Sequence, residues 1–268
     1  MREKVGIGYV QPSIAFGKKE RNVERALELA AQISESDLIV FPELFNTGYT
    51  FRGRKEAEGL AEDREDGYTS RELSKFSEDS GTCVVAGFVE RWGDQVYNSA
   101  IVIHEGEVLG SYRKIHLFFK EKEWFDPGDL GLRVFDTGSF RLGVMICFDW
   151  IFPEAARTLA LRGSDIIAHP SNLVRPYAQH AMLTRSVENR VYTVTANRIG
   201  REQRGGLEFE FTGQSQVTTP DMEVIHRAPE AEEEVFSTEI HLEKARNKNY
   251  SELNHLFQGR RTEAYRLG

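Results

Sequence analysis

Apolar and polar residues follow two different spacings over the first part of the chain. Residues 5–11 (VGIGYVQ) alternate between the two kinds and predict a β-strand. Residues 20–33 show helical spacing instead, with these apolar residues on one face: Val23, Ala26, Leu27, Ala30 and Ile33. The short apolar run at 37–43 (DLIVFPE) predicts a buried strand with Glu43 at its carboxyl end. Open α/β sheets place their chemistry at that end of their strands.

The next stretch of the chain is dominated by predicted strands. Residues 52–66 are polar and loop-like, whereas 68–80 predict a helix. Residues 83–91 and 97–114 are apolar runs around Gly-containing turns, and they predict strands that pair antiparallel.

A strand followed by a helix is predicted between residues 133 and 162. The turn residues Thr137-Gly138 interrupt the apolar pattern, which then continues to Cys147. A helix from about Pro153 to Arg162 follows, and Pro153 suits its first turn. Cys147 is therefore expected where a strand leaves the sheet, just before a helix.

An internal repeat connects the two halves of the chain. Residues 36–42 (SDLIVFP) and 164–170 (SDIIAHP) share a pattern of serine, aspartate, aliphatic residues and proline, each after a predicted helix. The match predicts two similar α/β layers within one domain that spans residues 1–268.

The last third of the chain predicts further strands and a polar tail. Strands are expected at 192–200 and 235–242, with a Gly-rich loop at Gly205-Gly206 and a hairpin near Pro220-Asp221. The tail, residues 242–268, is too polar to form a core of its own. It carries a few apolar anchors that favour docking on a partner subunit: Leu253, Leu256, Phe257 and Tyr265.

Composition restricts the possible partners. The 268 residues include 42 acidic and 34 basic side chains, and the resulting net charge of −8 opposes binding to nucleic acid. No apolar run is long enough for a signal peptide or a membrane span, so we expect a cytoplasmic protein with no membrane partner. Two cysteines and seven scattered histidines show no metal-ligand spacing, so we expect neither a metal nor another cofactor.

The two cysteines differ in their surroundings. A lone cysteine in an apolar strand is more often a small buried hydrophobe than a catalyst, and Cys83 fits that description. Cys147 differs because a strand exit followed by a proline-started helix brings backbone N–H groups and a helix N-terminus towards its sulfur. Both features favour a thiolate.

Two charged residues in apolar surroundings are further candidates for chemistry. Glu43 is equally compatible with catalysis and with a buried ion pair. Lys114 alternates with Arg113 and Ile115, so its ammonium points to the opposite face of the strand, but a lone lysine is more often at the surface.

Three segments together resemble the nitrilase superfamily of carbon–nitrogen hydrolases: FPELFNTGY (41–49), YRKIHLF (112–118) and MICFDWIFPEAAR (145–157). The resemblance continues through 169–173, 185–200 and 260–265, and so covers nearly the whole chain. It implies an α/β fold of the four-layer αββα sandwich type. It also implies a homodimer with the tail reaching across to the partner.

The same resemblance implies a catalytic set. The family's glutamate, lysine and cysteine fall on Glu43, Lys114 and Cys147, and its second glutamate falls on Glu121, with Glu123 as the other register. In this arrangement the glutamate carries the proton of the thiol, and the lysine stabilises the anion formed by attack on the substrate.

Further residues are expected around that set. The backbone N–H of Phe148 is a second oxyanion donor. Asp149, Trp150 and Asn172 are candidate pocket residues, although a structural role for Asp149 and Trp150 is equally compatible with the sequence. Glu121 is expected to orient the substrate and to hold Lys114.

The chemistry indicates the reaction class better than the substrate. We expect a small aliphatic amide to be converted to acid and ammonia through a cysteine thioester. A nitrile and an N-carbamoyl amine are the alternatives, because FPEAAR resembles N-carbamoyl-amine amidases, whereas CFDW and HPSNLV resemble amidases and nitrilases of thermophilic archaea.

Other functions are also compatible with the sequence. A thiol hydrolase with His116 or His169 as its base would use a different proton carrier. A glutaminase subunit and a catalytically silent binding protein on the same fold are two more possibilities.

Overall fold

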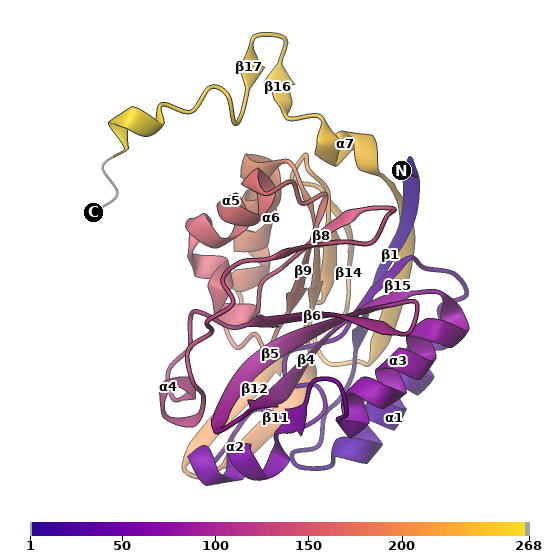
Figure 1. Cartoon of the computed structure of the whole chain (residues 1–268), viewed down its shortest axis with the longest axis vertical. Helices are drawn as coiled ribbons and strands as arrows, with labels where there is room; N and C mark the ends of the chain where they lie inside the picture. Colours follow the sequence, from indigo (N-terminus) through magenta and orange to yellow (C-terminus); the bar gives the residue numbers. More distant parts are fainter. Residues whose placement is uncertain (1, 266–268) are drawn as a thin grey trace.

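Two large β-sheets form the centre of the protein, and the computed structural model describes residues 2–265 (Figure 1). The first sheet has the order β15-β1-β2-β4-β5-β6, and the short strand β3 pairs with β4. Its strands are β1 (Lys4–Gln11), β2 (Leu38–Val40), β3 (Glu62–Asp63), β4 (Cys83–Trp92), β5 (Gln95–His104), β6 (Glu107–Arg113) and β15 (Glu234–His241).

The second sheet repeats this plan. Its order is β7-β8-β9-β10-β13-β14, and in each sheet three adjacent parallel strands are flanked by antiparallel ones. Strands β2 and β9 carry the repeated sequence and occupy equivalent places, so the predicted internal repeat is confirmed. The strands are β7 (Val134–Asp136), β8 (Arg141–Val144), β9 (Ile166–Pro170), β10 (Tyr192–Ala196), β13 (Gln216–Thr218) and β14 (Val224–Arg227).

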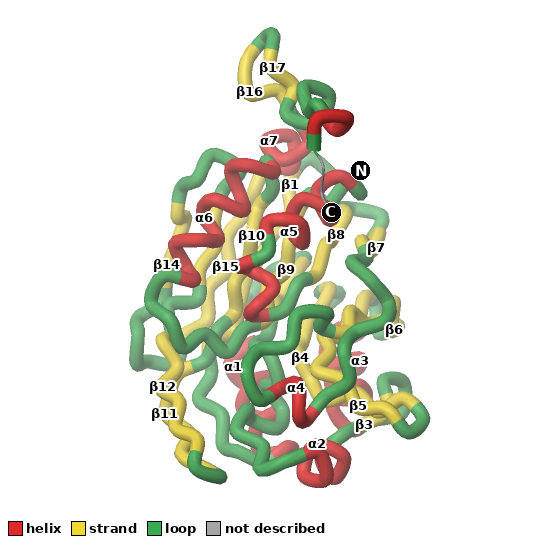
Figure 2. The backbone as a smooth tube through the Cα atoms, turned by 90° about the vertical axis from the view of Figure 1, so that its left-hand side faces the viewer, coloured by secondary structure: helices red, strands yellow, loops and turns green. Residues whose placement is uncertain are grey.

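Helices cover the outer face of each sheet (Figures 1 and 2). The apolar stripes of α1 (Lys19–Ala30) and α3 (Tyr68–Ser80) pack on the first sheet. Those of α5 (Pro153–Leu161) and α6 (Ala178–Asn189) pack on the second. The predicted four-layer αββα sandwich is confirmed.

The main hydrophobic core lies between the two sheets. Side chains of alternate residues on facing strands meet there, among them Val40 and Val85 of the first sheet and Val144 and Val194 of the second. Cys83 is part of this core and is fully buried, as expected from its apolar run. The core holds the loops at the strand ends in fixed positions.

Several predicted boundaries are wrong in informative ways. Strand β8 ends at Val144, and Cys147 begins a 3₁₀ turn, η1 (Cys147–Ile151), instead of ending the strand. Strand β2 likewise ends at Val40, three residues before Glu43. The stretch predicted as a loop contains α2 (Arg54–Leu60). Two strands, β10 and β11 (Ile199–Arg204), replace the single strand predicted at 192–200, because the chain turns at Asn197.

The remaining elements lie outside the two large sheets. Strand β11 pairs with β12 (Leu207–Thr212) in a separate hairpin, and α4 (Glu121–Trp124) is a single turn. The tail contains α7 (Leu242–Arg246), β16 (Asn249–Ser251), β17 (Asn254–His255) and η2 (Thr262–Ala264).

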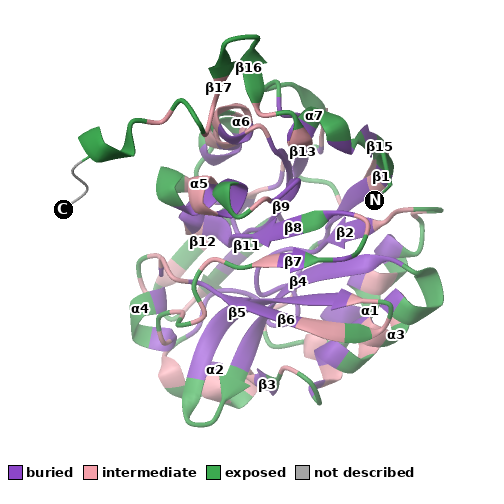
Figure 3. Ribbon diagram, turned by 45° about the horizontal axis from the view of Figure 1, so that its top comes forward, coloured by how far each residue is buried: buried purple, intermediate pink, exposed green. Residues whose placement is uncertain are grey.

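The tail after α7 extends away from the body of the protein (Figures 1 and 3). Its hairpin is largely exposed, and Leu253 is 93% exposed. Residues 266–268 of the predicted tail, like Met1, lie outside the described residues. No helix within residues 2–265 combines the length and the apolar character needed to cross a membrane.

Candidate active site

Three loops bring the predicted glutamates and lysine together inside the protein. Lys114 directly follows β6, and its ammonium Nζ lies 2.6 Å from Glu43 Oε1 and 2.8 Å from Glu121 Oε1. All three side chains are fully enclosed. Cys147 lies near enough for the charges of all three to act on its thiol. Residues from four separate segments therefore form one buried cluster.

Lys114 is fixed through its backbone as well as its side chain. Its N–H donates to the carbonyl of Asn98 at 2.9 Å, and its own carbonyl accepts from the N–H of Gly128 at 3.0 Å. Burial disfavours the charged ammonium, but the carboxylates of Glu121 and Glu43 outweigh it and keep the pKa of Lys114 above its ordinary value. The site therefore contains a permanent, fixed positive charge.

The two oxygens of Glu43 have different surroundings. Oε1 accepts hydrogen bonds from Lys114 Nζ and, at 2.7 Å, from Asn98 Nδ2. Oε2 is buried and has no partner among the described residues. The backbone carbonyl of Glu43 accepts from Asn172 Nδ2 at 2.9 Å, which fixes the loop. One oxygen is thus free to accept a proton.

Glu121 is surrounded by hydrogen-bond donors. The hydroxyl of Tyr49 donates to it at 2.6 Å and the N–H of Phe118 at 3.2 Å, in addition to Lys114. Burial raises the pKa of Glu121 to about 7, although Lys114 opposes the rise. Glu123, the other register considered for this residue, lies at the surface.

Cys147 occupies an unusual backbone conformation. Its φ angle is +40°, a region that residues other than glycine seldom adopt and that is held only where the surroundings enforce it. The Nε2–H of His169 donates to the carbonyl of Cys147 at 2.9 Å. Burial and then Glu43 raise the pKa of the Cys147 thiol well above its ordinary value, whereas Lys114 and the backbone N–H of Asn172 lower it. The resting thiol is therefore protonated.

The residues after Cys147 support its turn. Asp149 Oδ2 accepts from the N–H of Ile146 at 2.7 Å and from the hydroxyl of Tyr112 at 2.8 Å. Asp149 Oδ1 lies 2.6 Å from His116 Nδ1. Both oxygens of this fully buried carboxylate are thus occupied by the protein itself.

The aromatic residues around this turn are only half-buried. The ring of Phe148 lies 5.1 Å from that of Phe118, between ring centres. Trp150 contacts the ring of Tyr177, and its carbonyl accepts from Arg185 Nε at 3.0 Å.

Neither candidate histidine forms a hydrogen bond with the sulfur of Cys147. His169 is buried between Cys147 O and Thr195 Oγ1, and burial lowers its pKa to about 4. His116 bonds to Asp149 and stacks on Phe152 with ring centres 3.7 Å apart. Both histidines are thus engaged by other groups, whereas Glu43 Oε2 has no partner among the described residues.

Two contacting residues were not among the predicted site residues. Tyr49 lies in the quoted segment FPELFNTGY, but nothing there shows that its hydroxyl reaches Glu121. Asn98 did leave a signal, because it is a polar residue at an inward-facing position of a strand with Ala100 and Val102. A buried polar residue in such a strand requires a partner.

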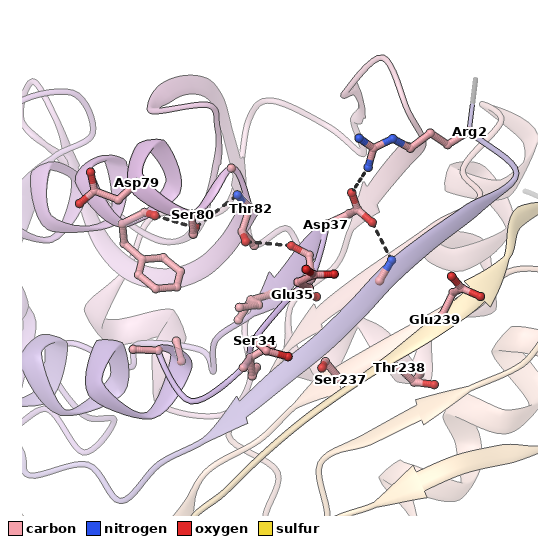
Figure 4. A pocket seen from close by; sticks show the side chains of 18 residues that line it. Arg2, Ser34, Glu35, Asp37, Asp79, Ser80, Thr82, Ser237, Thr238 and Glu239 are labelled. Atoms are coloured by element: carbon pink, nitrogen blue, oxygen red, sulfur yellow. Dashed lines mark hydrogen bonds and ion pairs between the residues drawn. The ribbon is translucent and has the colours of Figure 1, made fainter.

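A separate hollow of about 960 Å³ lies at the amino end of β2, whereas Glu43 lies beyond the carboxyl end of that strand (Figure 4). Asp37, just before β2, lies in it, and its oxygens bind Arg2 Nη1 at 2.6 Å and the N–H of Gly6 at 2.7 Å. Among the described residues that line this hollow, none is a cysteine, histidine or lysine. The candidate catalytic side chains thus lie beyond the carboxyl end of β2, away from this hollow.

Comparison with known proteins gives one consistent result. The family model described as carbon-nitrogen hydrolase matches residues 6–250. The chain is 49% identical over 263 residues to a protein from Pyrococcus abyssi named nitrilase, covering 97% of this chain and 99% of that one. It is 30% identical over 258 residues to an N-carbamoylputrescine amidase from Solanum lycopersicum, covering 89% and 85%.

A solved structure agrees with the sequence comparisons. The carbon-nitrogen hydrolase from Helicobacter pylori G27 superposes with a TM-score of 0.87 at 25% identity, and the match covers 98% of this chain and 97% of that one.

Proposed function

The chain belongs to the carbon–nitrogen hydrolase family of the nitrilase superfamily, and on that premise we propose that it hydrolyses a small amide through a thioester on Cys147. The observation that carries this proposal is the buried cluster of Glu43, Lys114 and Glu121 beside a cysteine in a left-handed turn. Glu43 Oε2 is the only carboxylate oxygen of this cluster that lacks a hydrogen-bond partner among the described residues.

The first step requires a base because the thiol rests protonated. Glu43 Oε2 takes the proton of Cys147, and the sulfur attacks the carbonyl carbon of the amide. The resulting oxyanion accepts hydrogen bonds from Lys114 and from the backbone N–H of Phe148. Removing one such donor typically lowers the rate by about 10²- to 10³-fold.

Cleavage of the carbon–nitrogen bond returns the proton. Glu43 gives it to the departing nitrogen, ammonia leaves, and the acyl group stays on Cys147 as a thioester. Glu43 then takes a proton from water, and the hydroxide attacks the thioester. The proton returns to the sulfur, so each cycle consumes one amide and one water and releases one acid and one ammonia.

Glu121 acts through Lys114 in this scheme. It shares the ammonium with Glu43 and is itself held by Tyr49. With carboxylates on two sides, the ammonium stays charged and aimed at the position of the oxyanion.

The neighbouring residues have supporting roles in the same proposal. Asp149 braces the Cys147 turn, since its oxygens are already engaged. Asn172 lies against both Cys147 and Glu43, and it and Trp150 border the substrate.

A nitrile is the second candidate substrate, because the relative with 49% identity is named nitrilase. Attack on a nitrile gives a thioimidate, which needs one water to release ammonia and a second to release the acid. An N-carbamoyl amine is the third, since the relative from Solanum lycopersicum carries that activity in its name. The same residues serve all three routes.

Ammonia release distinguishes these substrates. The purified protein is assayed with matched sets of aliphatic amides, nitriles and N-carbamoyl amines, with Cys147→Ala as the blank. We expect the highest kcat/KM for an amide. Preference for a nitrile or a carbamoyl amine would replace the substrate, and no release from any set would refute the hydrolase function and favour a binding protein.

We further propose that residues 1–268 form one functional unit that pairs with a second copy through the tail. The exposed residues Tyr250 and Leu253 lie on the part of the tail that extends from the body (Figure 3). Such large exposed apolar residues are typical of interfaces. Deleting residues 249–268 should lower the molar mass measured by light scattering from that of two chains to that of one, and a mass that still corresponds to two shortened chains would contradict this docking.

A further inference from the structure

Asn98 links two members of the cluster and has no assigned role. It lies in β5, opposite Val89 of β4, and is fully buried. Its side-chain Nδ2 donates to Glu43 Oε1 at 2.7 Å, and its backbone carbonyl accepts from the N–H of Lys114 at 2.9 Å. One strand residue thus fixes both the side chain of the glutamate and the backbone of the lysine.

The orientation of the Asn98 amide is set by its partner. Only the NH₂ group can donate to a carboxylate, so Oδ1 must point away from Glu43 Oε1. In that orientation Oδ1 is buried and has no partner among the described residues. A buried acceptor without a partner is unfavourable. The protein thus tolerates an unfavourable arrangement at Oδ1 while keeping the bond to Glu43.

The bond gives the two oxygens of Glu43 separate tasks. With Lys114 alone as a donor, the carboxylate can turn and present either oxygen to the ammonium. A second donor on Oε1 fixes the plane of the group and leaves Oε2 without a donor. A proton acceptor works best when it is aimed and not already bonded.

We propose that Asn98 is a positioning residue that holds Glu43 Oε1 and so reserves Oε2 as the base for Cys147. This inference rests on the proposed function of Glu43. It does not depend on which amide, nitrile or carbamoyl amine is the substrate, because the proton transfer from the thiol is common to all three.

The test measures the reactivity of the Cys147 thiol and not the rate of substrate turnover. In a Cys83→Ala background, Cys147 is the sole cysteine, and its alkylation by iodoacetamide is measured by intact mass between about pH 5 and pH 9. The readout for each variant is the ratio of its alkylation rate to that of the background protein, followed as a function of pH.

Asn98→Ala should give a ratio that rises with pH. The substitution removes one of the two donors to the Glu43 carboxylate, and a hydrogen bond to a carboxylate favours its charged form over its neutral one. We expect the rate to fall by about 10-fold or more at the acid end, the usual effect of losing a hydrogen bond to a charged group, and to recover towards the alkaline end.

Asn98→Asp should give the opposite slope. The new side chain has nearly the same shape, and at low pH its carboxyl can donate a proton to Glu43 Oε1 in place of the amide. At high pH two adjacent carboxylates repel each other and disfavour the thiolate, so the ratio falls. A purely structural role for Asn98 predicts ratios that do not change with pH.

The other titratable groups facing Glu43 are unchanged in both variants. They are Lys114 after β6, Glu121 of α4, Cys147 of η1, His169 of β9 and Tyr49 of the loop after β2. They contribute to the profile of the background protein and of each variant alike, so opposite slopes report on position 98.

Ser99→Ala is the matched control. Ser99 is the next residue of β5, is fully buried, and donates to Glu90 at 2.6 Å on the opposite face of the strand. Ser99→Ala should lower thermal stability about as much as the Asn98 variants do. Its alkylation profile should equal that of the background protein. Flat ratios for both Asn98 variants, or the same change in Ser99→Ala, would overturn the inference.

The two proposals fail in different ways. Opposite slopes without ammonia release from any substrate would leave the positioning of Glu43 intact and refute the hydrolase function. Ammonia release with flat ratios would keep the function and remove the role of Asn98.

Discussion

Replacing Lys114 by methionine removes the only positive charge that contacts Glu43 and Glu121 among the described residues. Methionine has a similar length and no charge, so the change leaves two carboxyl groups enclosed with no cation between them. Breaking a buried ion pair in this way typically costs about 3–5 kcal/mol, because the charge that remains is neither solvated nor paired. We expect a loss of stability in that range near neutral pH.

The loss should depend on pH with a definite sign. The pKa of Glu121 is raised in the folded protein from its ordinary value of 4.5 to about 7, a shift equivalent to about 3 kcal/mol. The folded state therefore binds this proton more tightly than the unfolded chain. The associated stability is fully present below pH 4.5 and is lost as pH rises through about 7.

The variant should strengthen this trend. Since Lys114 lowers the pKa of Glu121, its removal raises that pKa further and extends the loss of stability to higher pH. The difference between the two proteins should thus be small near pH 5 and large near pH 8, values chosen on either side of about 7. Urea unfolding at both pH values measures the difference directly.

Lys120→Met is the control. Lys120 is partly exposed and pairs with the exposed Glu123, so its loss should change stability by less than about 0.5 kcal/mol at either pH. Lys114→Met should also lower ammonia release by at least about 10²-fold, because an oxyanion donor is missing. A stability loss that is small or independent of pH would refute the argument that Lys114 compensates two buried carboxylates.

Four further substitutions test the other assignments. Tyr49→Phe removes the hydroxyl that donates to Glu121, so the pKa of Glu121 should rise further and kcat should fall by about 10-fold, measured as ammonia release across pH. Glu43→Gln should abolish both turnover and Cys147 alkylation while His116→Ala keeps both, and the reverse pattern would make a histidine the base. Cys83→Ala should leave kcat unchanged and lower stability by about 1–2 kcal/mol in urea unfolding, since it only empties a small volume of the core.

The four-layer fold was predicted from the family resemblance, and the apolar runs of strand length agreed with it because they predict most strands of both sheets. The repeat around β2 and β9 even indicated that the two sheets are alike. Helices α2 and α6 were not predicted, because each of them buries few apolar residues. Only Ala57 is buried in α2, and α6 buries polar side chains such as Gln179 and Ser186.

The position of Cys147 was predicted more accurately than its conformation. The run GVMIC is apolar to its end and so predicts a strand that continues to the cysteine. The chain leaves the sheet earlier because the carboxylate of Asp149 binds the N–H of Ile146 and Cys147 adopts a positive φ. These contacts are local, but no hydrophobic pattern encodes them.

Residues that act through others are the hardest to find in a sequence. Tyr49 and Asn98 are far along the chain from the groups they bind, with separations of 72 residues to Glu121 and 55 to Glu43. Only the packing of the sheets brings them together. Both are nonetheless fully or nearly buried polar residues, and each needs a partner to be tolerated there.

The energetic logic of the site joins these observations. Four ionisable groups are enclosed in one place, which is unfavourable unless each charge is compensated. Lys114 and the donors Asn98 and Tyr49 provide that compensation for the two glutamates, and they leave a single oxygen of Glu43 without a bond. The same arrangement that lets the cluster be buried therefore selects the atom that is able to take a proton. Stability and reactivity at this site therefore depend on the same hydrogen bonds.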